Sequence, residues 1–451
     1  MNNYVKIYQL KKIPAAERKR IMKRGAGEVE AIMPQVRKVM DDVQKKGDEA
    51  ILYYMKKFDG VTLTRKNLKV TKKEIEVAYK NIDEKLLNSL KILNNQVQNF
   101  HNLQKPKEWF TELSPGLIAG QMVVPLNIAG CYTPGGRGWF PSTVFMNACP
   151  AKAAGVKKII MCTPVNKNGS INPGGLVAMD MVGVNEIYKI AGAQAIAAMG
   201  FGTESIPESD IVVGPGSAWV VAAKMVLKEM GKLIGVEAGP GECLVLADDS
   251  ANPEFLASDM IIQCEHGNDS AGVLVTTSAK QAQEVQKLVH KYVDELPNFR
   301  QQFAINSLAK YGAIIVVNSI ESGIDFVNEY VVEHLQISTA YPMQVMKKIK
   351  NAGAFYLGNY SPMSAGCFCS GPNHVLPTAK FGRLRGGLTT EDFLKKITFE
   401  YPSKEGLEYL EEAMTTLADY ETFYAHGNAI RRRFPKKYKY NSQEKKYLRN
   451  K

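Results

Sequence analysis

The chain has 451 residues, 45% of them hydrophobic and 23% charged, which is the composition of a folded globular protein with room for two or more domains. No apolar run is long enough to cross a bilayer, and the first residues, MNNYVKIYQLKK, lack the apolar core of a signal peptide, so we expect a cytoplasmic protein. The formal net charge is +12, but ten basic residues and one acid lie from Arg431 onward, so the body of the protein is close to neutral and suits a small-molecule enzyme better than a nucleic-acid-binding surface.

Two long helical stretches are expected in the N-terminal quarter. Apolar residues recur at near-helical spacing from about Val29 to Phe58 and again from about Lys72 to Leu103. After Pro115 the chain changes to short apolar runs separated by glycine and proline. These runs are expected to be buried strands, with helices between several of them: VVPLNIAG, VKKIIMCTP, EIYKIAG, DIVVG and KLIGVEAG.

The alternation of strand and helix then repeats. CLVLADD, AGVLVTT, AIIVVN and GAFYLG are the strands expected in a second α/β unit, with helices near 253–263 and 280–296. From about Thr389 the chain is expected to be helical, through FLKKITFEYPS and beyond. The pattern predicts parallel sheets covered by helices, with ligand sites at the carboxyl ends of the strands.

A glycine-rich turn, GCYTPGGRGWFPSTVFMNACP, follows the first of these strands. Its backbone N–H groups and Arg137 are suited to a phosphate group. However, neither G-x-G-x-x-G nor a Walker A sequence occurs in the chain. From these residues alone, a nucleotide site and a plain structural turn stay equally open.

Glu333 and His334, the last two residues of EYVVEH, are the candidate catalytic pair. A carboxylate can deprotonate water, and an imidazole can move protons to and from an alcohol, so together they suit an alcohol oxidation that ends in hydrolysis. The alternative is an ordinary pair on a solvated surface. The catalytic interpretation is favoured because the chain has only six histidines, and His266, His374 and His426 also lie in stretches rich in other ligand and acid types.

A metal site is a further candidate. Gln263 and His266 are three residues apart at the end of a predicted helix, so both can lie on one face. Imidazole is a common zinc ligand, whereas a glutamine amide is an unusual one. Cys367 and His426 would complete a tetrahedral set, although their separation in the sequence does not show that they converge. The seven cysteines, an odd number, do not form a disulfide framework and are expected to be reduced.

Eight stretches in this order resemble the histidinol dehydrogenase family over nearly the whole chain: CYTPGGRGWFPSTVFM, AGAQAIAAMGFGTESIP, VVGPGSAWV, EAGPGECLVLAD, ASDMIIQCEHGNDS, VVEHLQ, SAGCFCSGPNHVLPT and YETFYAHGNA. Members of that family oxidise the primary alcohol of histidinol through an aldehyde to the carboxylate, using two molecules of NAD in succession. The resemblance also implies a homodimer whose active sites draw residues from both subunits.

The fold implied by this resemblance is α/β, with two incomplete Rossmann-like domains built on parallel sheets and small helical extensions at the termini. The implied limits are 1–27 for the N-terminal extension, 28–126 together with 242–378 for the domain that carries the catalytic pair and metal ligands, 127–241 for an inserted NAD-binding domain, and 379–451 for a helical C-terminal extension with the basic tail.

The resemblance also gives the candidate residues their roles. Glu333 would activate the water that attacks the aldehyde, and His334 would be the acid–base group for the alcohol steps. The zinc ligands would be Gln263, His266, Cys367 and His426, the last from the partner subunit. The substrate contacts would be His374, Glu421 and Gly241. The NAD contacts would be Tyr132, Gln194 and Ser217.

Three positions depart from the family pattern. Cys367 stands where the family has an aspartate zinc ligand, and since a thiolate also binds zinc, the metal site is either kept in altered form or lost, with Cys369 as the other candidate ligand. Gly241 replaces a serine that contacts the substrate, and Ser217 replaces an asparagine that contacts NAD. This combination leaves open the same chemistry on another polar alcohol, as in the similar sulfopropanediol dehydrogenases, or a non-catalytic ligand-binding protein.

The basic C-terminal tail has tyrosines between its charges, at Tyr438, Tyr440 and Tyr447. Proteins that bind single-stranded nucleic acid combine aromatic side chains, which stack on the bases, with basic side chains, which contact the phosphates. We expect instead a solvated tail or a segment docked on a partner subunit, and no nucleic-acid partner.

Overall fold

The computed structural model describes residues 4–24, 27–136 and 138–437. The chain divides into two compact units, one of Met1–Lys105 with Pro125–Phe393 and one of Pro106–Val124 with Leu394–Lys451. Arg137 of the glycine-rich turn and the three tail tyrosines lie outside the described residues. The two units are described separately below.

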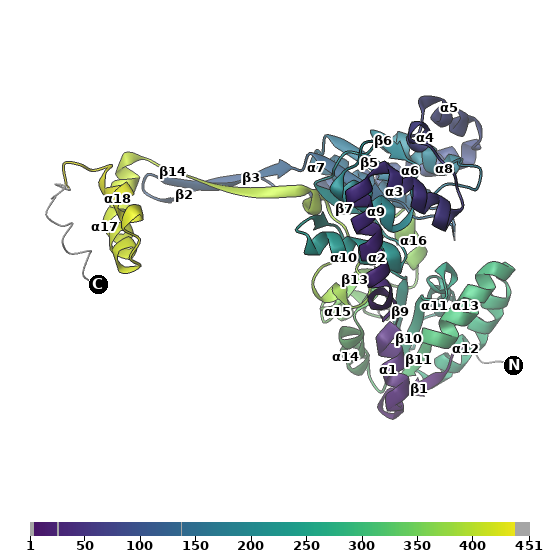
Figure 1. Cartoon of the computed structure of the whole chain (residues 1–451). Coiled ribbons are helices and arrows are strands. Elements are labelled where there is room, and N and C mark those ends of the chain that lie inside the picture. Colours follow the sequence, from purple (N-terminus) through teal and green to yellow (C-terminus); the bar gives the residue numbers. More distant parts are fainter. Residues whose placement is uncertain (1–3, 25–26, 137, 438–451) are drawn as a thin grey trace. The chain divides into compact units, whose positions relative to one another are not determined.

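A six-stranded sheet in the first unit carries the candidate catalytic pair (Figure 1). Its strands have the order β1-β11-β10-β9-β12-β13, and all neighbours are parallel. The strands are β1 (Ile7–Gln9), β9 (Glu242–Ala247), β10 (Ala271–Thr276), β11 (Ala313–Val316), β12 (Val332–Ser338) and β13 (Ala352–Leu357).

Alternate residues of these strands face two separate cores. In β9, Cys243 and Val245 pack in one buried cluster and Leu244 and Leu246 in the other. This explains why the strands are continuous apolar runs, as parallel strands covered on both faces require.

The helices of this part are α1 (Ala15–Lys23), α11 (Pro253–Ile261), α12 (Ala279–Asp294), α13 (Asn298–Tyr311), α14 (Ile320–Tyr330), α15 (Pro342–Met346) and α16 (Met363–Cys367). Its 3-10 turns are η1 (Leu10–Lys12), η4 (Cys264–His266), η5 (Phe381–Arg383) and η6 (Thr390–Phe393).

A second parallel sheet in the same unit has five strands in the order β6-β5-β4-β7-β8. The strands are β4 (Ile128–Tyr132), β5 (Lys158–Cys162), β6 (Glu186–Tyr188), β7 (Ile211–Val213) and β8 (Leu233–Ile234). The helices that follow its strands are α7 (Pro141–Ala154), α8 (Pro173–Val182), α9 (Gly192–Phe201) and α10 (Ala218–Glu229). The predicted α/β class with two parallel sheets is therefore confirmed.

The helices expected in the N-terminal quarter are present, and some of them belong to the core of the five-stranded sheet. The segment from α2 to η3 shares one buried cluster with α9 and α10, for example through Val36, Ile51 and Val226. The resemblance implied instead that residues 28–126 form one domain with residues 242–378, and these domain limits stay predictions. These helices are α2 (Gly27–Lys46), α3 (Asp48–Tyr54), the π-helix η3 (Met55–Asp59), α4 (Arg65–Leu68), α5 (Lys72–Lys80) and α6 (Glu84–Leu103).

Two predictions of secondary structure, both involving strands of the second unit, are wrong. Residues 394–402 were expected to be helical but form β14 (Leu394–Pro402), in a three-stranded sheet with β2 (Trp109–Ser114) and β3 (Leu117–Pro125). The run VVPLNIAG was expected to be one strand, but it ends β3 and then begins β4. Strand pairing stabilises both segments, and that long-range pairing is invisible in a local apolar pattern. The helices α17 (Lys404–Tyr420) and α18 (Tyr424–Arg431) follow.

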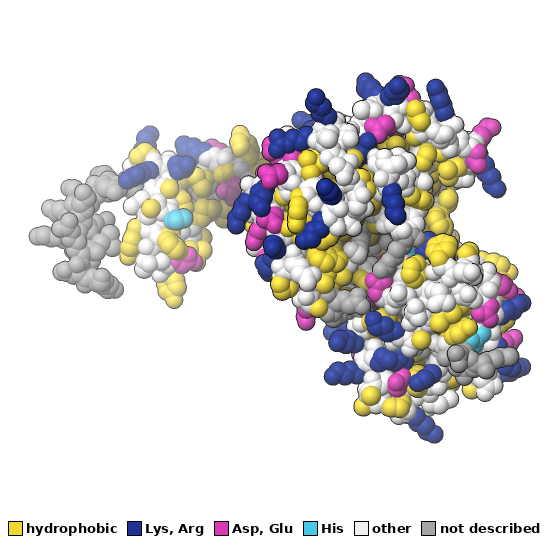
Figure 2. Space-filling model, turned by 45° about the vertical axis from the view of Figure 1, so that its right-hand side comes forward, with side chains coloured by type: hydrophobic (Ala, Val, Ile, Leu, Met, Phe, Trp, Pro, Cys, Tyr) yellow, Lys and Arg dark blue, Asp and Glu magenta, His cyan; other side chains and the backbone are white. Residues whose placement is uncertain are grey.

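The surface of the first unit carries no single field of positive charge on the face seen in Figure 2, where lysine and arginine side chains are scattered among acidic ones. This agrees with the near-neutral body expected from the sequence. No helix within the described ranges is long and apolar enough to span a membrane.

Candidate active site

Glu333 and His334 lie at the amino end of β12, where both side chains are at least nine-tenths buried. The carboxylate oxygen Oε2 of Glu333 accepts a hydrogen bond from the backbone N–H of Glu242, at 2.8 Å. Nδ1 of His334 lies 3.2 Å from the carbonyl oxygen of Glu242 and 3.2 Å from Oε2 of Glu333. The pair is therefore not a solvated surface feature. Its position at the amino end differs from the general expectation of a site at the carboxyl ends of the strands.

The two ring nitrogen atoms of His334 have different surroundings: Nδ1 contacts Glu242 and Glu333, whereas Nε2 does not. Its ring stacks on that of Tyr356, with 5.9 Å between the ring centroids. Nε2 is buried and has no hydrogen-bond partner of good geometry among the described residues, although Cys367 lies beside the ring. Burial lowers the pKa of His334, but the charge of Glu333 and the contact with Cys367 outweigh burial and raise the pKa to about 10. The unpartnered Nε2 is thus the atom that can meet a ligand.

His374 lies on the other side of Cys367. Its Nδ1 is 2.7 Å from the carbonyl oxygen of Cys367, and its Nε2 is 3.2 Å from the hydroxyl of Thr143, at the start of α7. Burial lowers the pKa of His374 to about 4, opposed by the hydrogen bond to Cys367 and reinforced by the nearby charges of His334 and His266. The structure therefore brings these three histidines and Cys367 to one place.

Gln263 and His266 were expected at the end of a helix; α11 ends at Ile261, and His266 belongs to the 3-10 turn η4 that follows. The amide oxygen of Gln263 lies beside Gly241, and a Cβ atom at position 241 would be only 2.3 Å from it. The ring of His266 stacks on Phe140, with 6.2 Å between centroids. Residue 241 and the two predicted ligands thus belong to the same region of the first unit.

The predicted zinc ligands are only partly grouped within one chain. No cluster of three or more His, Cys, Asp or Glu side chains arranged to hold a metal occurs in the part of the chain that the structure describes. Glutamine is not one of those four residue types. The amide oxygen of Gln263, an imidazole nitrogen of His266 and the thiol of Cys367 have the chemistry of a zinc site, while Cys369 is exposed.

Glu421 and His426 belong to the second unit. Both are exposed, and the ring of His426 lies 5.2 Å from that of Phe423. They flank the turn between α17 and α18, where Thr422 has a left-handed backbone with φ of 62°. Within the described chain, these two predicted site residues are therefore placed only in relation to their own unit.

The predicted cofactor residues lie at the carboxyl ends of the five-stranded sheet. Tyr132 ends β4, and its hydroxyl accepts a hydrogen bond from the N–H of Gly192 at 3.2 Å. Gln194 is buried in the first turn of α9, and its amide lies 3.4 Å from Oδ2 of Asp59. Ser217 is the exposed N-cap residue of α10. Tyr132 and Gln194 meet around Gly192, and Ser217 follows β7 at the same edge.

A surface cavity of about 480 Å³ is lined by residues that lie close in the sequence to two of these predicted contacts. Its wall includes Tyr53, Phe58 and Trp219, and the last two rings are 5.9 Å apart. Phe58 precedes Asp59, the partner of Gln194, and Trp219 lies two residues after Ser217. The other lining residues are Gln35, Lys38, Val39, Asp42, Lys46, Glu49, Ala50, Tyr54 and Lys57.

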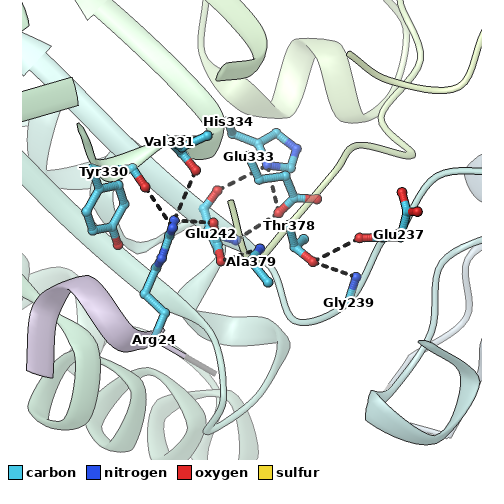
Figure 3. A network of polar contacts seen from close by, with 10 residues as sticks. All are labelled: Arg24, Glu237, Gly239, Glu242, Tyr330, Val331, Glu333, His334, Thr378 and Ala379. Carbon is cyan, nitrogen blue, oxygen red and sulfur yellow. Dashed lines mark hydrogen bonds and ion pairs between the residues drawn. The ribbon is translucent and has the colours of Figure 1, made fainter. Parts of the chain in front are cut away.

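Sequence reasoning missed the polar network beside the candidate catalytic pair (Figure 3). The guanidinium group of Arg24 forms an ion pair with Glu242 at 2.5 Å, and both side chains are buried. The other oxygen of Glu242 accepts a hydrogen bond from Ala379 N–H at 3.0 Å. Burial raises the pKa of Glu242, while the charge of Arg24 opposes that shift. The only signal in the sequence was that Glu242 directly follows Gly241.

Comparison with known proteins gives one consistent result. The family model described as histidinol dehydrogenase matches residues 22–434. The chain is 42% identical over 431 residues to histidinol dehydrogenase of Methanocaldococcus jannaschii, covering 95% of this chain and 98% of the relative, and 39% identical over 429 residues to that of Synechocystis, covering 95% and 99%. The crystal structure of histidinol dehydrogenase from Elizabethkingia anophelis superposes with a TM-score of 0.90 at 36% identity, over 97% of this chain and 99% of that one.

Proposed function

The chain belongs to the histidinol dehydrogenase family of oxidoreductases, and on that premise we propose that it oxidises a primary alcohol through an aldehyde to a carboxylate, with NAD as the hydride acceptor. L-Histidinol is the substrate proposed first, because relatives named histidinol dehydrogenase match over 95% of this chain.

The observation that carries the proposal is the burial of Glu333 and His334 side by side, both held by the backbone of Glu242. Nδ1 of His334 faces Glu242 and Glu333, so Nε2 is the atom that would exchange a proton with the alcohol. Because burial is outweighed by the charge of Glu333, which raises the pKa of His334, the imidazole would first release the proton on Nε2 and then take that of the alcohol. Oε2 of Glu333 already accepts one hydrogen bond, so the other carboxylate oxygen would deprotonate the water that attacks the aldehyde.

Zinc is the proposed metal, with Gln263, His266 and Cys367 as ligands and the partner subunit's His426 as the fourth. The mixed nitrogen, oxygen and sulfur donor set suits zinc, and the amide oxygen of Gln263 lies beside Gly241, next to the catalytic pair. When bound, zinc would hold the substrate through its nitrogen atoms. His374 and Gly241 of the same chain would contact the substrate, together with Glu421, in a homodimer with shared sites.

NAD would lie along the carboxyl edge of the five-stranded sheet, with Tyr132, Gln194 and Ser217 as its contacts. Such an edge is where nucleotides bind in open α/β sheets. Phe58 in the wall of the cavity directly precedes Asp59, the partner of Gln194, and aromatic rings such as those of Phe58 and Trp219 can stack on an adenine base. We therefore propose that the adenosine half of the cofactor occupies this cavity.

The proposal is tested by measuring the zinc content of the purified protein and, in parallel, the formation of NADH from NAD and histidinol. Zinc together with formation of histidine supports the full proposal. Zinc with NADH formation from other alcohols only would retain the chemistry and reject histidinol. If neither zinc nor any alcohol-dependent NADH were found, both the metal site and the oxidation would be rejected.

A second candidate is the same chemistry on another polar alcohol, such as a sulfonated diol. It is favoured by the substrate side of the site, where the amide of Gln263 occupies the space that a side chain at position 241 would need. A panel of primary alcohols, compared by kcat/KM with histidinol, separates the two candidates. The substrate with the highest kcat/KM identifies the one that the site fits.

A further inference from the structure

Val331, two residues before Glu333, has a backbone conformation that its side chain disfavours. Its φ of 59° and ψ of 66° are left-handed, and the residue is 1% exposed. A β-branched residue rarely adopts this conformation because its side chain crowds the neighbouring carbonyl groups. The turn joins the end of α14 to the start of β12, so it sets the direction in which the catalytic pair leaves the helix. Something outside the turn must therefore hold it.

Arg24 is the residue that holds this turn (Figure 3). Its guanidinium group donates to the carbonyl oxygen of Tyr330 at 2.7 Å and to that of Val331 at 3.3 Å. It also lies 4.1 Å above the centre of the Tyr330 ring. The carbonyl groups on both sides of the strained residue are thus bound by one rigid, buried cation.

The same guanidinium group fixes the residue that contacts both catalytic side chains. Glu242 is bound to Arg24 through its carboxylate, while its backbone N–H contacts Glu333 and its carbonyl oxygen contacts His334. Glu242 is the first residue of β9, which pairs with β12 in register at His334. Arg24 therefore acts on the pair by two routes, through the turn at Val331 and through Glu242.

We propose that Arg24, in the N-terminal part of the chain, is a positioning residue that keeps Glu333 and His334 in their reactive orientation by holding the left-handed turn at Val331 and the side chain of Glu242. This inference rests on the proposed roles of Glu333 and His334. A purely structural role would be different, because loss of a buried ion pair would then lower the unfolding temperature without changing the kcat of the protein that stays folded.

The first experiment compares Arg24→Met with Arg18→Met, measuring kcat, the KM for NAD and the unfolding temperature. Arg18 lies in α1, the helix that ends one residue before Arg24, and forms an exposed ion pair with Glu329 at 2.5 Å, so it controls for loss of a charge in this part of the chain. In Arg24→Met, kcat should fall about 10- to 100-fold in protein that is still folded, because small displacements of catalytic groups have effects of that size. The KM for NAD should stay within twofold, and Arg24→Lys should recover part of kcat.

The second experiment places Val331→Gly in the Arg24→Met background. Glycine adopts a left-handed backbone without strain, so the turn should persist without the arginine. The double variant should therefore regain a large part of the lost kcat, although glycine does not restore the ion pair or raise the unfolding temperature. A kcat of Arg24→Met within twofold of the wild type, or no recovery in the double variant, would overturn the proposal.

A third measurement separates this inference from the proposed function. If the wild type formed NADH from none of the alcohols tested, the proposed function would be rejected. Hydrogen exchange of residues 331–335 would then still test whether Arg24 holds the turn at Val331. Exchange there should be faster in Arg24→Met, or in Arg24→Lys if the methionine variant does not fold, than in Arg18→Met. Equal exchange would mean that Arg24 does not hold this turn.

Discussion

Glu333→Gln should separate the two oxidation steps. The amide has nearly the same size and still accepts the hydrogen bond from Glu242 N–H, which is 2.8 Å long in the native site. It cannot deprotonate the water that attacks the aldehyde. General base catalysis contributes about 10²- to 10⁴-fold in rate, or about 3 to 5.5 kcal/mol of barrier. Oxidation of the aldehyde should slow by that factor, whereas the alcohol step, which we assign to His334, should slow much less.

The assay is the number of NADH molecules formed for each alcohol consumed, with an amine reagent present to trap free aldehyde. Wild-type protein should form two, and Glu333→Gln should form close to one, with trapped aldehyde as the product. Glu321→Gln is a matched control, because Glu321 is exposed on the preceding helix α14, where it pairs with Lys348 at 3.6 Å. Two NADH for each alcohol at nearly the wild-type rate in Glu333→Gln would show that Glu333 is not the base.

Three further predictions concern the cofactor cavity, the metal site and a buried carboxyl group. Trp219→Ala should raise the KM for NAD about tenfold but leave that for nicotinamide mononucleotide unchanged, since only NAD carries an adenine to stack. Gly241→Leu should weaken zinc binding about tenfold in a chelator titration, because a large side chain at this position would displace Gln263. Gly175→Leu is the control and should leave zinc binding unchanged, because the space around Gly175 is open. Burial raises the pKa of Asp259 from 3.8 to about 7, so the folded chain retains this proton where the unfolded chain loses it. The free energy of unfolding should then fall by up to about 1.4 kcal/mol for each pH unit across that range, and urea denaturation of Asp259→Asn should lack this fall.

Local sequence patterns predicted the two sheets well, because parallel strands buried on both faces are apolar throughout their length. The same reasoning failed at residues 394–402. That segment alternates charged and apolar residues, such as Lys396 and Ile397, and its strand state depends on pairing with β3, far away in the sequence. Propensity could not supply that information, since edge pairing is a tertiary interaction.

The candidate site was predicted unevenly for a related reason. The residues proposed to contact reacting groups, Glu333, His334 and His374, could be selected from the sequence by their chemical types. Arg24 belongs to a stretch of ordinary basic residues, and its partner Glu242 lies 218 positions away in the chain. Nothing in the sequence distinguishes Arg24 from Arg18, which is exposed. Positioning residues of this kind become visible only when the fold is known.

The position of Glu333 and His334 at the amino end of β12 agrees with how the two sheets meet. In the proposed reaction, the alcohol carbon would have to approach the nicotinamide, so the end of the sheet proposed to bind NAD would have to face the end of the sheet that carries the proposed base. The start of α7, which follows β4 of the five-stranded sheet, makes this connection: Thr143 lies 3.2 Å from His374, and Phe140 stacks on His266. The carboxyl edge of the five-stranded sheet thus meets the amino edge of the six-stranded one. In this arrangement a pair at the carboxyl end of β12 would be separated from the proposed cofactor site by the length of the strand.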